Sequence, residues 1–269
     1  MTSYVFVDGA ALQVFLKESA KTLAPNIEPS VDWSKVFASF GRGRILFYDA
    51  YPSKREDEAD EDFNTRWAKK DELFRELGRI HNVHVRLGAG TRRRKKIGQI
   101  QKGVDVLLAI ESYGHAMRGN IQRATFVLAD LDFLPLFEAL LQTQTVTELR
   151  YFKNKTNADL IEAADVAQPI RLHDFVGWTG SEFREHVQIV PLRPQDVARQ
   201  EIRTQRELVK TGRILGQEVN FYRVQRLGTY WAEFPARNRG GMWQSSSLDL
   251  LIEVVEAKGQ GLIEFDMPG

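Results

Sequence analysis

Short apolar runs recur along the first part of the chain, and longer amphipathic segments separate them. The runs are rich in Val, Ile, Leu and Phe and cover residues 4–7, 44–48, 83–87, 125–129 and 148–152. Each has the length of a buried strand. In the segments between them, apolar residues recur three and four positions apart, as in helices that pack on one face. Examples are residues 61–79, 101–117 and 133–142. This alternation predicts a three-layer α/β sandwich with a parallel sheet over residues 1–168.

The texture of the sequence changes after residue 168, which fits a chain of 269 residues with two domains. Pro and Gly become scattered and arginines are frequent. We predict a small α+β domain of unknown role over residues 175–269. Its expected strands are residues 217–223 and 229–234, and its expected helices are residues 194–210 and 246–257.

Charge and residue usage exclude several classes of function. Lys and Arg number 37 and Asp and Glu 36, so the net charge of +1 gives no general attraction to nucleic acid, and any such signal is local. The absence of cysteine excludes disulfides, thiolate nucleophiles and Cys-ligated metals. Hard cations with oxygen ligands are then the natural metals. We expect a cytoplasmic protein with no membrane partner, because there is no signal-peptide pattern and no apolar run of ~20 residues.

Acidic residues follow the predicted strands at the points where they end. Asp8 follows the first strand, Asp49 the second, and Asp130 and Asp132 the fourth, while Asp105 interrupts the apolar pattern of a predicted helix. In an open parallel sheet, the ligand crevice lies beyond the carboxyl ends of the strands. These side chains are therefore expected near one another.

Carboxylates gathered at one edge repel one another unless a cation or protons compensate. Mg²⁺ or Mn²⁺ accepts a few carboxylate oxygens and keeps positions for water and a phosphate, which is the chemistry of phosphodiester hydrolysis. Each acid also has a structural interpretation. Asp8, Asp130 and Asp132 can cap helices, and Asp49 suits a turn. Capping does not explain Asp105.

The segments that carry these acids resemble the NYN family of PIN-like ribonucleases over about residues 1–168. The matching stretches are VFVDGA at 5–10, FYDA at 47–50, KGVDV at 102–106, DLDFLPL at 130–136 and LIEAAD at 160–165. The resemblance implies a PIN-like, Rossmannoid fold and an endoribonuclease that uses Mg²⁺ or Mn²⁺. It places Asp8, Asp105, Asp130 and Asp132 in the catalytic, metal-binding cluster.

This sequence departs from the family pattern at neighbouring positions. The family commonly has Asn where this chain has Ala11, and Ser-Gly-Asp-Ser-Asp where it reads Leu-Ala-Asp-Leu-Asp at 128–132. The acids are kept, whereas polar side chains are replaced by Ala11, Leu128 and Leu131. An alternative function is therefore a catalytically weak or inactive NYN-fold module that binds RNA or another protein.

Basic residues cluster in the connection that precedes Asp105. A phosphate backbone favours such clusters through counterion release, so we expect RNA, single-stranded or structured, as the partner. The alternative is a solvated loop. The expected RNA-binding residues are Arg92, Arg93, Arg94, Lys95, Lys96 and Lys102, with Arg237 and Arg239 in the C-terminal domain. A DNA substrate, a homo-oligomer and a protein partner of the C-terminal domain all stay open.

Overall fold

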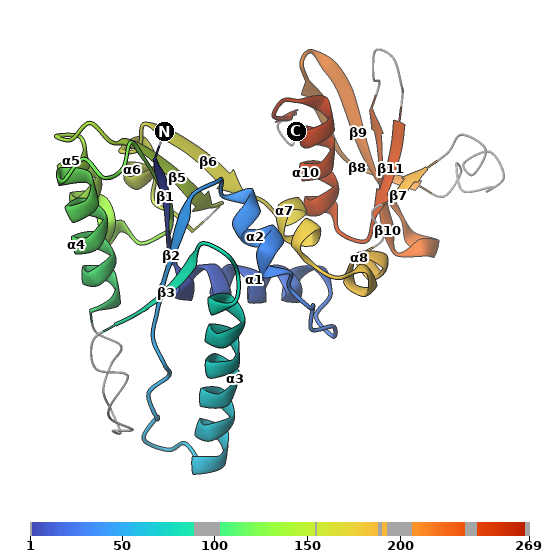
Figure 1. Ribbon diagram of the computed structural model, residues 1–269. Coiled ribbons are helices and arrows are strands. Elements are labelled where there is room, and N and C mark those ends of the chain that lie inside the picture. Colours follow the sequence, from blue (N-terminus) through green and yellow to red (C-terminus); the bar gives the residue numbers. More distant parts are fainter. Residues whose placement is uncertain are drawn as a thin grey trace. The chain divides into compact units, whose positions relative to one another are not determined.

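The computed structural model of the chain describes residues 2–88, 103–153, 155–187, 190–192, 206–234 and 241–266 (Figure 1). It forms two compact units. The first contains Met1–Lys17 and Trp33–Ile170, and the second contains Glu18–Asp32 and Arg171–Gly269. Residues 18–32, which the sequence pattern grouped with the N-terminal domain, thus belong with the C-terminal unit. Among the described helices, none combines the length and apolar character that a membrane span needs.

The first unit is built on a six-stranded sheet in the order β3-β2-β1-β4-β5-β6. All neighbouring strands are parallel. The strands are β1 (Ser3–Asp8), β2 (Arg44–Asp49), β3 (Val83–Leu87), β4 (Arg123–Val127), β5 (Val146–Phe152) and β6 (Val166–Ile170). The predicted fold class is confirmed. The sixth strand, β6, was not predicted, because Pro169 and Gln168 interrupt its apolar pattern.

Helices cover both faces of this sheet. On one face lie α2 (Trp33–Ser39), α3 (Asp60–Gly78) and the part of α1 (Gly9–Leu23) that belongs to the first unit. The other face carries α4 (Val104–Met117), the short helix η1 (Leu131–Phe133), α5 (Leu134–Leu140) and α6 (Ala158–Glu162). Figure 1 shows α4 and α5 on the side of the strands opposite α2 and α3. The first turn of α3 is acidic, which suits the positive end of a helix dipole.

The alternation of strand side chains decides which helices each residue meets. Phe6, Leu46 and Tyr48 pack in one core with residues of α4 and α5. Phe47, one position along, instead meets the aromatic rings of α2, with its ring centroid 6.2 Å from that of Trp33. By the same period of two, Asp8 belongs to the α4 face and Asp49 to the face of α1, α2 and α3.

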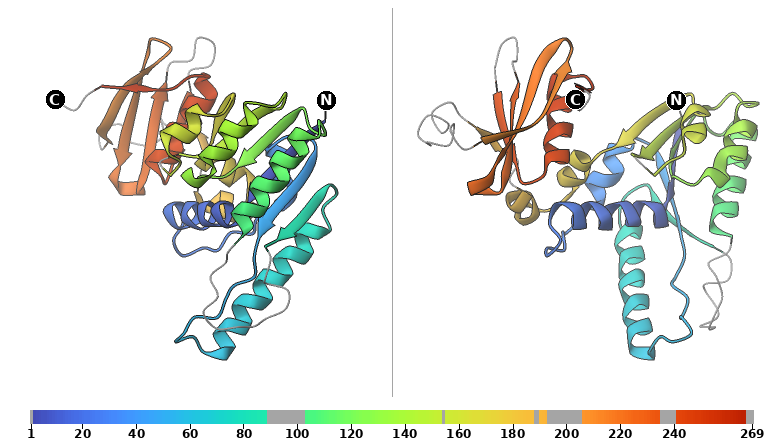
Figure 2. Two further views of the ribbon diagram at one scale, coloured as in Figure 1. Left: turned by 90° about the vertical axis from the view of Figure 1, so that its left-hand side faces the viewer. Right: turned by 180° about the vertical axis from the view of Figure 1, so that it is seen from behind.

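The second unit is a small α+β domain with a six-stranded antiparallel sheet in the order β12-β8-β9-β10-β11-β7. Its strands are β7 (Val190–Leu192), β8 (Arg206–Ile214), β9 (Gln217–Val224), β10 (Thr229–Phe234), β11 (Gly241–Ser245) and β12 (Glu264–Phe265). Its helices are α7 (Leu172–Trp178), α8 (Ser181–Val187), η3 (Gln225–Leu227) and α10 (Leu248–Gly259). Figure 2 shows α10 along one face of the sheet, where Leu251 and Val255 pack against Phe221 and Ala232.

The helix predicted over residues 194–210 is wrong in its described part. Residues 206–210 begin β8, which pairs with β9 along its length; residues 194–205 lie outside the described residues. The two strands are joined by Leu215 and Gly216, which both have positive φ, as a tight two-residue hairpin requires. Pairing with β9 therefore overrides the helical spacing of apolar residues in this stretch. The helix predicted over residues 246–257 is confirmed as α10.

Candidate acidic active site

The candidate site lies where the strand order of the first sheet reverses, between β1 and β4. The chain runs outward from β1 through β2 to β3, and then returns through α4 to place β4 on the other side of β1. Open α/β sheets bind ligands in the crevice at such a switch point, beyond the carboxyl ends of the strands. Asp8 ends β1, and Asp130 follows the end of β4. The topology thus brings two of the predicted acids to one crevice.

Asp8 is partly buried and also caps helix α1. Its Oδ1 accepts hydrogen bonds from the backbone N–H of Ala10 at 2.9 Å and of Ala11 at 3.0 Å. The pKa of Asp8 is raised to about 6: burial is the largest cause, the charges of Asp105 and Asp49 add to it, and the Ala11 and Ala10 bonds act in the opposite direction. The capping interpretation is therefore correct for Asp8, but it leaves this carboxylate in an unfavourable electrostatic environment.

Asp105 and the Asp130–Asp132 pair complete the cluster. Gly103, with φ of 96°, precedes α4 and places the exposed Asp105 in its first turn. Burial, then the charges of Asp130 and Asp132, raise the pKa of Asp105. Asp130 Oδ1 accepts the N–H of Asp132 at 3.0 Å and so caps η1. Charge interactions link Asp8 to Asp105, and Asp105 to the pair.

The donor chemistry of the cluster fits a hard divalent cation. Its ligands are carboxylate oxygens. Burial, and after it the charge of neighbouring acids, raises the pKa of both Asp8 and Asp105, and a bound cation would offset both effects. Within the described residues, no three His, Asp or Glu side chains converge closely enough to hold a metal ion. The predicted acids thus lie near enough to interact by charge, but the described side chains do not form a complete set of metal ligands.

Asp49 belongs to a separate buried network that sequence reasoning missed. Its side chain is only 1% exposed, and its Oδ2 lies 2.7 Å from Lys70 Nζ and accepts a hydrogen bond from Gln13 Nε2 at 2.7 Å. Lys70 also donates to Gln13 Oε1 at 2.8 Å. Lys70 lies on α3 and Gln13 on α1, so no local spacing could have revealed the pairing. Asp49 is therefore a buried, ion-paired acid on the face of the sheet opposite to that of Asp8.

The remaining predicted residues divide into those that the structure places and those that it does not. Leu128 is fully buried in the α4-side core, whereas Leu131 is exposed between the two acids of η1. Apolar side chains therefore stand where the family commonly has polar ones. The predicted RNA-binding residues lie outside the described residues: Arg92, Arg93, Arg94, Lys95, Lys96, Lys102, Arg237 and Arg239.

Comparison with known proteins places the first unit in a family. No curated protein matches the chain. A crystal structure of a protein of unknown function from Vibrio parahaemolyticus is similar, with 15% sequence identity and a TM-score of 0.42, over 63% of this chain and 92% of that one. The family model described as NYN domain matches residues 2–171. Because this match spans more than half of the sequence, the chain belongs to the NYN domain family of PIN-like, nuclease-type proteins.

Proposed function

We propose that the first unit is a metal-dependent endoribonuclease that hydrolyses RNA phosphodiester bonds at the acidic cluster. The observation that carries this proposal is the set of mutually repelling carboxylates at the switch point of the sheet, in a chain of a nuclease family. Repulsion of this kind costs stability and serves no packing purpose, which favours a functional origin.

In this proposal Asp8, Asp105, Asp130 and Asp132 would hold Mg²⁺ or Mn²⁺. The ion would supply a water of lowered pKa and would offset charge on the phosphate. The protein positions the groups: the Ala10 and Ala11 bonds fix one Asp8 oxygen and leave the other for a ligand. Asp105 is exposed at the start of α4, where an RNA phosphate can approach it.

The basic residues supply the affinity for the substrate in this proposal. Phosphate contacts strengthen binding without selecting sequence, and the clustered arginines and lysines before α4 precede Asp105 in the chain. Arg92, Arg93, Arg94, Lys95, Lys96 and Lys102 are proposed to hold the RNA backbone, as are Arg237 and Arg239 of the second unit.

The deciding experiment is cleavage of end-labelled single-stranded RNA by the full chain in Mn²⁺, Mg²⁺ or EDTA. Asp105→Asn is compared with wild type and with Glu138→Gln, which removes an exposed carboxylate on α5. We expect metal-dependent cleavage that falls at least about 100-fold in Asp105→Asn and is unchanged in the control. Equal cleavage in EDTA, or by Asp105→Asn, would refute the proposed mechanism.

A catalytically weak or inactive RNA-binding module is the second candidate. The observation that favours it is the buried Leu128 and the exposed Leu131 beside the acids, where a polar side chain could have held a water. This candidate predicts that RNA binds, that its affinity falls with added salt, and that the RNA stays intact in every metal.

A further inference from the structure

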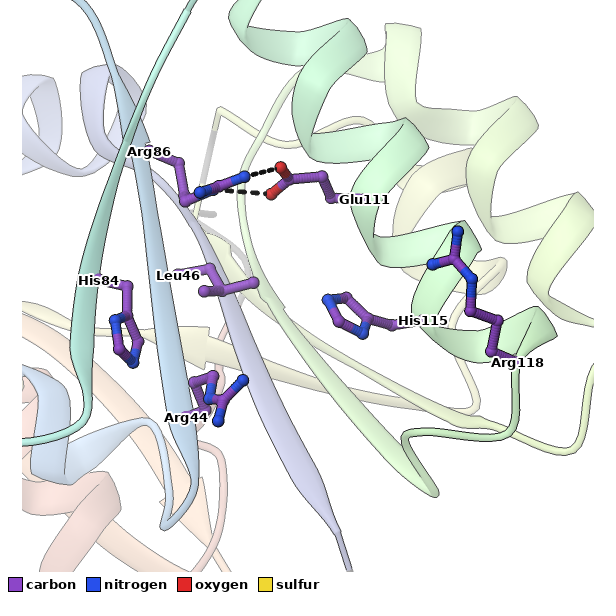
Figure 3. Close-up of a pocket in the computed structure, with 7 residues that line it drawn as sticks. All are labelled: Arg44, Leu46, His84, Arg86, Glu111, His115 and Arg118. Carbon is purple, nitrogen blue, oxygen red and sulfur yellow. Dashed lines mark hydrogen bonds and ion pairs between the residues drawn. The ribbon is translucent and has the colours of Figure 1, made fainter.

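A recess of about 370 Å³ lies in the first unit between α4 and the strands β2 and β3. Arg44 of β2, His84 of β3, and His115 and Arg118 of α4 surround it, with Leu46 between them (Figure 3). We call these five residues, together with Arg86 and Glu111, the basic recess. Its volume is at the lower end of the range for small-molecule sites.

Glu111, the acid among these seven residues, is already neutralised. Arg86 holds Glu111 through two hydrogen bonds, from Nε at 3.0 Å and from Nη2, and the Tyr48 hydroxyl donates to the same carboxylate at 2.8 Å. Burial alone would raise the pKa of Glu111, but the bonds from Arg86 and Tyr48 lower it. The Arg86–Glu111 pair therefore adds no net charge.

Positive charge remains in the recess that no carboxylate of the described residues balances. Within the described residues, neither Arg44 nor Arg118 forms an ion pair. Arg44 lies over the ring of Tyr4, 5.3 Å from its centroid, and Arg118 donates to the carbonyl of Gly114 at 3.2 Å. Both arginines are exposed, so a bound anion can replace water around them.

Burial and the nearby positive charges favour the neutral form of the His115 imidazole. Burial lowers the pKa of His115, and the charges of Arg118, Arg44 and Arg86 lower it further, against the opposite effect of Glu111. The ring packs edge-on against Tyr4, with centroids 4.9 Å apart, and projects from α4 toward the strands in Figure 3. A neutral imidazole in that position can donate a hydrogen bond to an anion without adding repulsion.

We propose that the basic recess is an anion site, which binds a terminal phosphate group carried by an RNA end or by a free nucleotide. A terminal phosphate carries up to two charges and three acceptor oxygens, which suits arginines and imidazoles that surround one space. The middle of an RNA strand offers one charge per phosphate and would have to enter and leave the recess. A chain end or a small molecule avoids that requirement.

The basic recess is separate from the acidic cluster. Asp105 is in the first turn of α4 and Arg118 is its C-cap, so these two residues lie about 20 Å apart along the helix, and Glu111, a residue of the recess on α4, lies about 9 Å from Asp105 along the same axis. Arg44 likewise begins β2, whereas Asp8, Asp130 and Asp132 lie at or after the ends of β1 and β4. The proposal therefore stands whether or not the acidic cluster cleaves RNA.

Binding measured in EDTA tests the site without cleavage. The probes are AMP, inorganic phosphate, and one RNA hexamer with either a 5′-phosphate or a 5′-hydroxyl. The variants are Arg44→Gln/Arg118→Gln and Arg118→Gln alone, and the control is Arg213→Gln, which removes an exposed arginine from β8 of the second unit. Thermal unfolding checks that each variant is folded.

We expect the 5′-phosphorylated hexamer to bind at least about tenfold more tightly than the hydroxyl form, and the double variant to lose that preference. Binding of AMP that the double variant weakens tenfold, without a preference between the RNA ends, identifies a free nucleotide as the source of the phosphate. The control keeps wild-type affinity. The proposal is overturned if the hexamer binds equally well with a 5′-phosphate and with a 5′-hydroxyl while neither AMP nor inorganic phosphate binds. It is also overturned if the double variant binds every probe as wild type does.

Discussion

Asp8 is the residue where stability and chemistry conflict most directly. Two backbone bonds favour its charged form, but burial and the neighbouring acids disfavour that form more strongly, so its pKa rises to about 6. At neutral pH the folded protein must therefore hold a charge that the unfolded chain would accommodate freely. This cost is expected of a site that a cation completes.

Asp8→Asn is predicted to stabilise the metal-free protein at pH 7.5. The wild-type carboxyl has a higher pKa in the folded state than its ordinary value of 3.8, so its contribution to stability is fully present below pH 3.8 and is lost as pH rises through about 6. Asparagine can still accept the Ala10 and Ala11 bonds. Urea unfolding in EDTA should give a gain of about 1–3 kcal/mol at pH 7.5 that disappears near pH 4. A variant less stable than wild type at pH 7.5 would contradict this account.

Lys70→Met is predicted to destabilise the first unit, because it leaves the buried Asp49 carboxylate with Gln13 as its side-chain donor. We expect a loss of about 2–3 kcal/mol in the free energy of unfolding. The double variant Asp49→Asn/Lys70→Met removes both charges and should recover much of this loss. A double-mutant cycle by urea unfolding measures the coupling, and strictly additive losses would mean that the pair contributes nothing.

At the scale of elements, the turn from β1 into α1 depends on the lack of a side chain at Gly9. A Cβ atom there would lie 2.5 Å from Phe47 Cε1 and 2.9 Å from Asp49 Oδ2. Gly9→Ala is therefore predicted to cost about 1–3 kcal/mol and to displace the neighbouring Asp8. Gly78 ends α3, and a Cβ atom at that position would meet nothing within 4 Å, so Gly78→Ala should instead gain about 0.4–1 kcal/mol. Thermal unfolding compares the two, and equal effects would refute the steric argument.

The elements that the sequence predicted best are those with a strong local pattern. β1, β2 and β4 are continuous apolar runs, and α10 has a Ser N-cap, so residues near in sequence were sufficient. β6 and β8 were not predicted because their own residues carry only a weak strand pattern. β6 contains a proline at the edge of the sheet, and much of β8 is polar and exposed while it pairs with β9. Local propensity carries little information about such strands.

At the scale of the whole molecule, the acidic cluster could be predicted because topology fixes where strands end. Acids that follow parallel strands lie at the same edge of the sheet. The alternation of side chains still decides which face each one meets, and it separates Asp49 from the cluster. The Asp49–Lys70 pair and the basic recess could not be predicted in this way. Both join a strand to a helix that lies across a face of the sheet, and the register between those layers is set by packing. The sequence thus predicted which acids lie at this edge of the sheet, but not the contacts between strands and helices on its two faces.

A last prediction joins the acidic cluster to the stability of the whole chain. A cation that binds the folded cluster and not the unfolded chain stabilises by about 2.7 kcal/mol at 100 times its Kd, which for a protein of this size raises Tm by about 5–10 °C. We expect this rise with Mn²⁺ at pH 7.5 in wild type and in Glu138→Gln, but not in Asp105→Asn. At pH 5 the rise should shrink, because Asp8, with a pKa of about 6, is then mostly protonated and competes with the ion. An equal rise in Asp105→Asn would place the ion elsewhere, and the repulsion among the four acids would then need another explanation.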